Sequence, residues 1–146
     1  TIPSSGPADI WVWALPGENG NKAVTFAIEF PSNMIKLSVE TCDNPYMPVE
    51  TNYCDGNICN YSFGYYACQL DWYWLFHYFI YVLDSEASVV RIIPHQYLGK
   101  KSFVTCEEGY TEVNARVLTN LYLNTVDCPE ISVESTSWGA IKSMYR

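Results

Sequence analysis

Apolar and polar residues alternate with a period of two in two early segments of the chain. Residues 22–30 carry one apolar face, formed by Val24, Phe26, Ile28 and Phe30. Residues 35–40 carry another, formed by Ile35, Leu37 and Val39, with Lys36, Ser38 and Glu40 between them. Successive side chains of a strand point to opposite faces, so both segments predict half-buried antiparallel strands. The break between them is Pro31-Ser32-Asn33.

The segment from Trp72 to Leu83 is apolar on both of its faces. One face would carry Trp72, Trp74, Phe76, Tyr78, Ile80 and Val82. The other would carry Tyr73, Leu75, His77, Phe79, Tyr81 and Leu83. Such a strand is either central and covered on both sides, or has one face in an interface. A helix is the competing prediction, but the density of aromatic residues favours a strand. The run is too short to cross a bilayer, so we expect no transmembrane segment.

Other short segments also have strand-favouring composition and end at turn residues: 10–15, 88–93, 103–106, 111–123 and 131–134. Within 111–123 we expect Val113, Ala115 and Val117 to face inward. The segment from Cys42 to Cys59 is rich in turn residues and predicts an irregular excursion. About nine short strands without a long helix predict an all-β fold, an antiparallel two-sheet sandwich of Ig-like or jelly-roll-like type.

The length of 146 residues suits one domain with its own hydrophobic core. We expect this sandwich domain to span residues 10–134. An N-terminal arm, residues 1–9, would precede it, and a C-terminal tail, residues 135–146, would follow it. Ser137 is placed to cap a final helical turn of the tail, with Trp138, Ile141 and Tyr145 on one side.

The cysteine pattern predicts a disulfide framework. The chain has six cysteines, and four fall close together: Cys42, Cys54, Cys59 and Cys68, followed later by Cys106 and Cys128. An even number at this spacing is typical of exported proteins, so we expect an extracellular or cell-surface location with all six oxidised. The sequence does not fix the pairing. Short loops favour Cys54–Cys59, and Cys106–Cys128 would tie two late strands together.

The charge is negative and unevenly placed. The net charge is −8, which argues against binding to the phosphate backbone of a nucleic acid. No Lys or Arg lies between Lys36 and Arg91, whereas seven acids do. Basic residues gather late in the chain. Ordinary solvated acidic loops explain this pattern. The functional alternatives are cation binding and attraction to a basic surface on another copy.

No catalytic motif is present, so we expect no enzyme activity. His77 lies in the aromatic run and fits a core or interface histidine, and His95 has no metal-ligating neighbour at the required spacing. No cofactor is expected. Calcium stays open as a weaker alternative, with oxygen ligands at Asp43-Asn44, Asp55-Gly56-Asn57 or Glu107-Glu108, although turn chemistry explains these residues equally well. A glycan also stays open, attached at the sequon Asn60-Tyr61-Ser62 or bound by surface aromatics.

Two stretches resemble known families. The stretch Phe26-Ala27-Ile28-Glu29-Phe30-Pro31-Ser32-Asn33-Met34-Ile35-Lys36-Leu37-Ser38-Val39 resembles the early strand pair of cohesin-type sandwiches, with Pro31-Ser32-Asn33 in place of the usual Asp-Pro. This resemblance implies a fold type and not dockerin binding. The ending Ser137-Trp138-Gly139-Ala140-Ile141-Lys142-Ser143-Met144-Tyr145-Arg146 is similar to Trp-Gly-x-Ile/Val-Lys-x-Leu/Met-Tyr-Arg tails of small secreted bacterial proteins with no assigned role. It implies bacterial export.

Two function classes remain. The first, which we favour, is a structural protein that self-assembles into a filament or surface layer, held by strand or arm exchange and disulfides. The chain is aromatic and poor in charge, and its acidic middle complements its basic end. The expected contact residues are Ile2, Trp138, Ile141, Lys142, Tyr145 and Arg146. The second class is a secreted carbohydrate- or protein-binding module of adhesin type.

Overall fold

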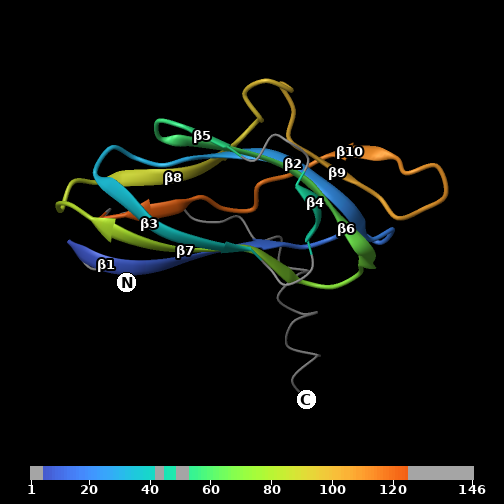
Figure 1. The fold of residues 1–146 in the computed structure, drawn as a ribbon, viewed down its shortest axis with the longest axis horizontal. Helices are drawn as coiled ribbons and strands as arrows, with labels where there is room; N and C mark the ends of the chain where they lie inside the picture. Colours follow the sequence, from blue (N-terminus) through green and yellow to red (C-terminus); the bar gives the residue numbers. More distant parts are fainter. Residues whose placement is uncertain (1–4, 42–44, 49–52, 125–146) are drawn as a thin grey trace, which may run out of the picture.

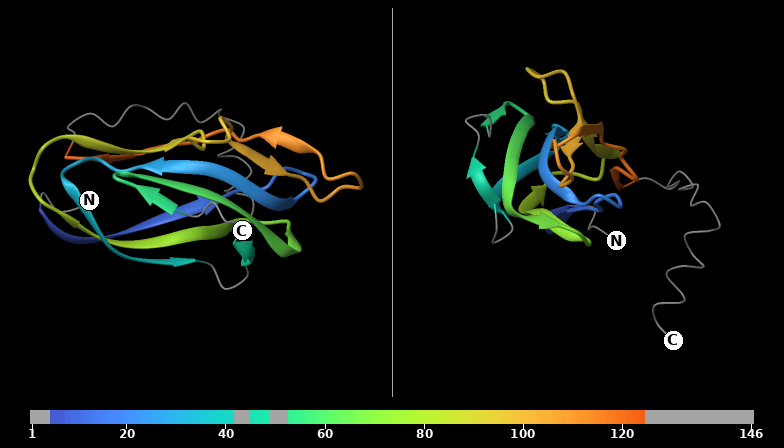
Figure 2. Two further views of the ribbon diagram at one scale, coloured as in Figure 1. Left: turned by 45° about the horizontal axis from the view of Figure 1, so that its top comes forward. Right: turned by 90° about the vertical axis from the view of Figure 1, so that its right-hand side faces the viewer.

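The protein is an all-β sandwich of two antiparallel sheets, as the sequence predicts (Figure 1). This computed structural model describes residues 5–41, 45–48 and 53–124. The strands in these ranges are β1 (Gly6–Ala14), β2 (Asn21–Glu29), β3 (Met34–Thr41), β4 (Pro45–Pro48), β5 (Tyr53–Asp55), β6 (Ile58–Gln69), β7 (Tyr73–Val82), β8 (Ser88–Ile93), β9 (Ser102–Val104), β10 (Glu112–Asn114) and β11 (Leu121–Leu123). They run roughly along the long axis of the molecule (Figure 2).

The smaller sheet, sheet A, has three strands in the order β1-β7-β3. Its central strand is β7, which pairs with β1 from Gly6↔Val82 to Ala14↔Tyr73 and with β3 on its other side. The inner face of β7 carries Phe76, Tyr78, Ile80 and Val82, all buried. The outer face of this sheet is the subject of the next subsection.

The larger sheet, sheet B, has β10-β9-β2-β6-β4 as its main path. β5 pairs with the beginning of β6, and β8 joins the end of β2 to β11. The central strand is β2, whose residues Val24, Phe26 and Ile28 face the core as predicted. Sheet B therefore has more strands than sheet A, and its central strand is flanked on both edges.

Aromatic side chains from both sheets fill the core. Phe26 of β2, Tyr61 and Phe63 of β6 and Phe76 of β7 contact one another, with the rings of Tyr61 and Phe76 only 4.2 Å apart between centroids. The two hydroxyl oxygens of Tyr61 and Tyr78 lie 2.5 Å apart, so the polar tips satisfy each other across the sandwich. Burial raises the pKa of both tyrosines. Each such ring stabilises the fold by about 1.5–3 kcal/mol.

The outer face of β2 is covered by its own chain, contrary to the half-buried strand that we predicted. Ala27 is fully buried although its side chain points away from the core. Its register neighbour Asn60 is also fully buried and bonds to Gln96, in the connection from β8 to β9 that arches over β2 in Figure 1. His95 from the same connection is buried, and its Nδ1 accepts hydrogen bonds from the backbone N–H groups of Tyr97 and Leu98.

Two predicted faces in sheet A are wrong, and an irregularity in the strand register lies within each segment. In β3 the apolar residues Ile35, Leu37 and Val39 are about half exposed, and Lys36 points inward instead. The pairing between β3 and β7 shifts between Lys36 and Ser38. In β7 the register shifts at Leu75, which is buried, and this places Trp74 beside Trp11 on the outer face. An extra residue inverts the alternation beyond it, which periodicity cannot reveal.

Several predicted boundaries also differ from the structure. β1 begins at Gly6, so residues 6–9 of the predicted arm belong to a strand. The predicted irregular excursion contains β4 and β5. Val113, which we expected to face inward, is 41% exposed on the short edge strand β10, whereas Ala115 and Val117 are half-buried. The predicted strand at 131–134 and the turn capped by Ser137 lie outside the described residues.

Candidate functional site

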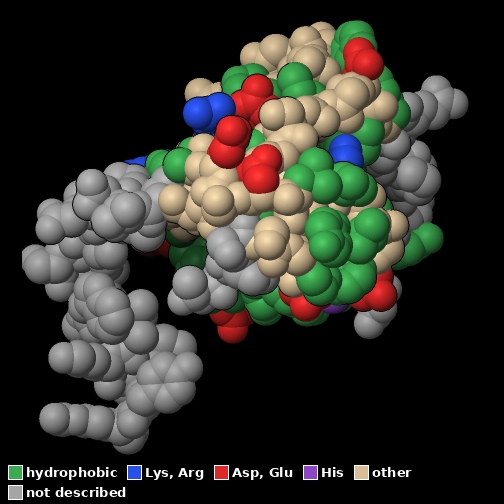
Figure 3. All heavy atoms as spheres, turned by 90° about the vertical axis from the view of Figure 1, so that its left-hand side faces the viewer, with side chains coloured by type: hydrophobic (Ala, Val, Ile, Leu, Met, Phe, Trp, Pro, Cys, Tyr) green, Lys and Arg blue, Asp and Glu red, His purple; other side chains and the backbone are tan. Residues whose placement is uncertain are grey.

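The outer face of sheet A is a broad surface of aromatic and aliphatic side chains. The large apolar residues that are 40–51% exposed on it are Trp11, Trp13, Ile35, Phe79, Tyr81 and Leu83. They come from all three strands of the sheet or, for Leu83, from just after β7. Seen from one end of the sandwich, hydrophobic side chains gather toward the lower part, where sheet A lies, with acidic and histidine side chains at the lower edge (Figure 3). We call this surface the aromatic face.

Trp11 stands upright on the aromatic face between neighbouring rings. Trp11 and His77 are register partners on β1 and β7, and their rings stack with centroids 3.9 Å apart and planes at 6°. Trp74 contacts Trp11 edge-on, at 5.4 Å. Rings stacked across neighbouring strands must stand on edge over the sheet, because the strands themselves lie about 4.8 Å apart. One face of the Trp11 ring is therefore already occupied.

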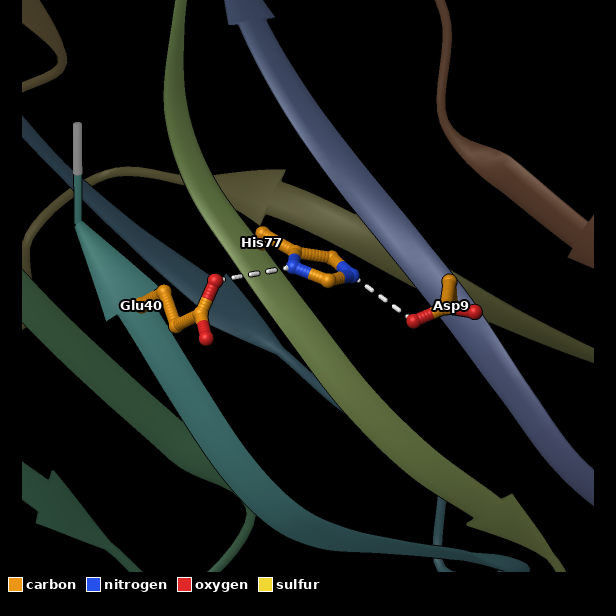
Figure 4. A network of polar contacts seen from close by, with 3 residues as sticks. All are labelled: Asp9, Glu40 and His77. Atoms are coloured by element: carbon orange, nitrogen blue, oxygen red, sulfur yellow. Dashed lines mark hydrogen bonds and ion pairs between the residues drawn. The ribbon is translucent and has the colours of Figure 1, made fainter.

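His77 holds a polar bridge across the aromatic face (Figure 4). Its Nε2 lies 2.7 Å from Oδ1 of Asp9 on β1, and its Nδ1 lies 3.2 Å from Oε2 of Glu40 on β3. The hydrogen bond to Asp9, followed by the bond to Glu40, raises the pKa of His77, although partial burial opposes the shift. The bridge thus links all three strands of sheet A, and it favours the doubly protonated ring, which can donate to both carboxylates.

This geometry holds the His77 ring in place and does not prepare it to act as a general base. Both ring nitrogens face carboxylates, so neither is free to take a proton from a third group. No hydrogen bond from His77 to a Ser, Thr, Cys or Lys side chain is present among the described residues. What the aromatic face offers is apolar area with two acidic groups at its centre, which suits binding of an apolar and basic partner.

A groove lies elsewhere, at the end of the sandwich where the β2–β3 and β5–β6 turns meet the start of β8. Its volume is about 740 Å³, and its one basic residue, Arg91, is paired with Glu29 at 3.1 Å. Asp55 adds one acid to the lining that is unpaired among the described residues, and the lining has no exposed aromatic side chain, so the groove offers less apolar surface for recognition than the aromatic face.

The structure settles two of the disulfide predictions. The Cys54–Cys59 bond is present, as predicted. The Cys106–Cys128 prediction is wrong, because Cys106 bonds Cys68 and joins the end of β6 to the segment after β9. Cys42 and Cys128 lie outside the described residues. Two disulfides indicate an oxidising environment for this protein.

The remaining predicted site residues fall outside the described ranges. These are the assembly contacts Ile2, Trp138, Ile141, Lys142, Tyr145 and Arg146. From the sequence we therefore predicted contact residues in the two terminal segments but missed the aromatic face. The signal for that face was present in the second alternative for residues 72–83, a strand with one face in an interface.

The structure bears on the predicted glycan, calcium and membrane features. Asn60 of the sequon is fully buried and bonded to Gln96, so the folded chain does not present it for glycosylation. The carboxylate of Glu107 accepts hydrogen bonds from Asn19 and Thr105. In the part of the chain that the structure describes, no three His, Cys, Asp or Glu side chains gather to hold a metal ion. Nor does any helix there have the length and apolar character to cross a membrane.

Comparison with known proteins adds no family. The chain matches no family model, no curated protein and no solved structure. Function is therefore argued from the aromatic face itself.

Proposed function

We propose that the protein is a non-enzymatic structural subunit that works outside the cell and assembles with further copies of itself through the aromatic face. The observation that carries this proposal is the exposure of six large apolar side chains on one face of a three-stranded sheet. Monomeric proteins rarely leave such a contiguous apolar surface in water, because its burial in a contact is favourable.

The size of the aromatic face fits a specific contact. Six side chains of about 200 Å² each, exposed by 40–51%, offer roughly 550 Å² per copy. A matching partner surface brings the total to about 1,100 Å², above the roughly 1,000 Å² expected of a biological interface. The Trp and Tyr residues among them are the types that dominate binding energy in interfaces.

The partner segment that we propose is the C-terminal tail of another copy. Trp138, Ile141 and Tyr145 would supply its apolar anchors, and Lys142 and Arg146 its positive charge. The aromatic face carries the acids Asp9 and Glu40 and no Lys or Arg that points outward from β1, β3 or β7. A tail-to-face contact joins two different surfaces, so each copy can bind a further one, and the contact builds a filament or layer when its rotation does not close a ring.

A glycan-binding module is the second candidate, and the ring stacking disfavours it. A sugar packs its C–H groups against a free aromatic face. In Trp11, one ring face is occupied by His77, and Trp74 contacts the ring edge-on. The Trp11 ring therefore offers less free face to a sugar than an unstacked ring would.

Three variants of the full chain test the proposal. The acceptor variant is Trp11→Ser/Tyr81→Ser, and the donor variant lacks residues 138–146. The control is Tyr97→Ser/Tyr110→Ser, which removes two exposed aromatics (64% and 61%) outside sheet A. We expect wild type and control to form polymers in sedimentation velocity and electron microscopy, and each of the other two variants to stay folded and monomeric.

Mixing sharpens the experiment. An equal mixture of the acceptor and donor variants should give dimers and nothing larger, because one intact tail then meets one intact face. Polymers of the acceptor variant equal to those of wild type would refute the aromatic face as the contact. A wild-type chain that stays monomeric but binds polysaccharide, and loses this binding on Trp11→Ser/Tyr81→Ser, would favour the glycan-binding module.

A further inference from the structure

The Cys54–Cys59 disulfide has one exposed and one buried end. The two cysteines are register partners in the hairpin of β5 and β6. Cys54 lies on the edge strand β5 and is exposed, whereas Cys59 is fully buried on the core side of β6. An incoming group can therefore approach the Cys54 sulfur from solvent, while the Cys59 sulfur is shielded by the sandwich.

A lysine faces the buried sulfur. Nζ of Lys36 lies 2.9 Å from Sγ of Cys59 and 4.9 Å from the ring centroid of Phe30. The inward orientation of Lys36 on β3 of sheet A brings it to Cys59 on β6 of sheet B. No carboxylate lies within ion-pair distance of Lys36 among the described residues, so the sulfur and the ring are the ammonium's recorded partners there. Burial lowers the pKa of Lys36.

We propose that Cys54–Cys59 is a site of thiol–disulfide exchange, at which a low-molecular-weight thiol attacks Cys54 and Lys36 assists the departure of Cys59. The proposal is independent of the assembly proposed above.

The chemistry is a simple displacement. An external thiolate forms a new S–S bond to Sγ of Cys54, the Cys54–Cys59 bond breaks, and its electron pair goes to Sγ of Cys59. The Lys36 ammonium hydrogen-bonds the new thiolate and can transfer its proton to give a Cys59 thiol and a neutral amine. No net oxidant or reductant is needed, because one disulfide replaces another. A nearby cation lowers a thiol pKa, and a leaving thiol of lower pKa departs faster.

The second disulfide, Cys68–Cys106, serves as an internal control for the exchange reaction. Cys68 and Cys106 are both half-buried, and no Lys or Arg contacts either sulfur among the described residues. The bond also packs against Gly20, whose φ is +67° and whose added Cβ would meet Sγ of Cys106 at 3.1 Å. Cys68–Cys106 therefore has a crowded approach and no cation to assist a leaving thiolate.

The test treats the full native chain with reduced glutathione, followed by alkylation and mass mapping. We expect glutathione on Cys54, an alkylated Cys59 thiol and an intact Cys68–Cys106 bond. Lys36→Met should slow the exchange about tenfold because the leaving thiolate loses its cation, and Lys36→Arg should keep most of the wild-type rate. Thermal unfolding of each variant checks that it is folded.

A second measurement separates charge assistance from packing. Cys54→Ser leaves Cys59 as a free thiol, whose pKa can be followed by the ultraviolet absorbance of its thiolate against pH. That pKa should rise by about one unit when Lys36→Met is added. Glutathione on Cys59 or first attack at Cys68–Cys106 would overturn the proposal. Equal exchange rates in folded wild type and Lys36→Met, or an unchanged Cys59 pKa, would overturn the role of Lys36.

Discussion

β2 and β7 are the central strands of their sheets, yet only β2 is covered on both sides. The outer face of β2 lies beneath the β8–β9 connection, where Ala27 and Asn60 are fully buried. The outer face of β7 leaves Phe79 and Tyr81 about 40% exposed. Similar strands thus have different surroundings within one domain.

The difference indicates which surface of the folded chain can still gain free energy by burial in an intermolecular contact. The β8–β9 connection covers part of the outer face of sheet B in the folded chain, and Asn60 and Gln96 satisfy each other's polar groups there. No described segment covers the aromatic face of sheet A, and only the Asp9–His77–Glu40 bridge crosses it. Apolar area that folding leaves in water is available to an intermolecular contact.

The largest effect should distinguish the two sides of β7 itself. Phe76→Ala empties a site in the core, where the ring is 2% exposed, and should lower the free energy of unfolding by about 3–5 kcal/mol. Phe79→Ala, three residues along the same strand, should cost only about 1–1.5 kcal/mol, because its ring is 40% exposed. Urea unfolding measures both. Equal losses would mean that the outer face of β7 is covered in the folded chain.

The disulfides should stabilise sheet B unequally. Removing Cys68–Cys106 by Cys68→Ala/Cys106→Ala opens a loop with a sequence separation of 38 and should cost about 4 kcal/mol. Removing Cys54–Cys59 in the same way opens a separation of 5 and should cost about 2 kcal/mol. Urea unfolding of the two double variants checks the order. A larger loss for the shorter loop would show that chain entropy does not govern these bonds.

The cover over β2 should depend on Asn60. Asn60→Ala leaves the backbone N–H and the side-chain oxygen of Gln96 without their partner, at a cost of about 1–3 kcal/mol. Its matched control is Asn114→Ala on the exposed edge strand β10, expected to change stability by less than about 0.5 kcal/mol. Hydrogen exchange of residues 94–101 should rise only in the first variant. Unchanged exchange would show that the connection is held by other contacts.

The smallest effect should be the pH dependence of the bridge on sheet A. The folded-state pKa of His77 is raised above its ordinary value of 6.5, so the bridge stabilises the fold fully below about pH 6.5. That contribution is lost as the pH rises through the folded-state pKa. Wild type should therefore exceed His77→Gln in stability most at mildly acidic pH, in unfolding measured from pH 5 to 8. Asp9→Asn/Glu40→Gln should abolish the same pH dependence, and a gap that widens with rising pH would contradict the assignment.

Local chemistry made parts of the structure predictable. The alternation in residues 22–30 gave the correct core face of β2, and the turn Asp55-Gly56-Asn57 brought Cys54 and Cys59 together as expected. The pairing of Cys106 could not be found in the same way. Its partner Cys68 is distant in sequence, and contacts of that kind depend on how the sheets stack.

The sequence by itself determined the strand composition, the turns, the disulfide chemistry and the excess of apolar strand surface. Only the tertiary structure decided which faces of β3 and β7 are buried. The pairing of β3 with β7 places Lys36 opposite buried Ile80, toward Cys59, and Ile35 opposite half-exposed Tyr81, and a register shift near Leu75 brought Trp74 to Trp11. The physical reason is that side-chain alternation is a local property with two equivalent phases. The choice between these phases follows from packing against elements far away in the chain.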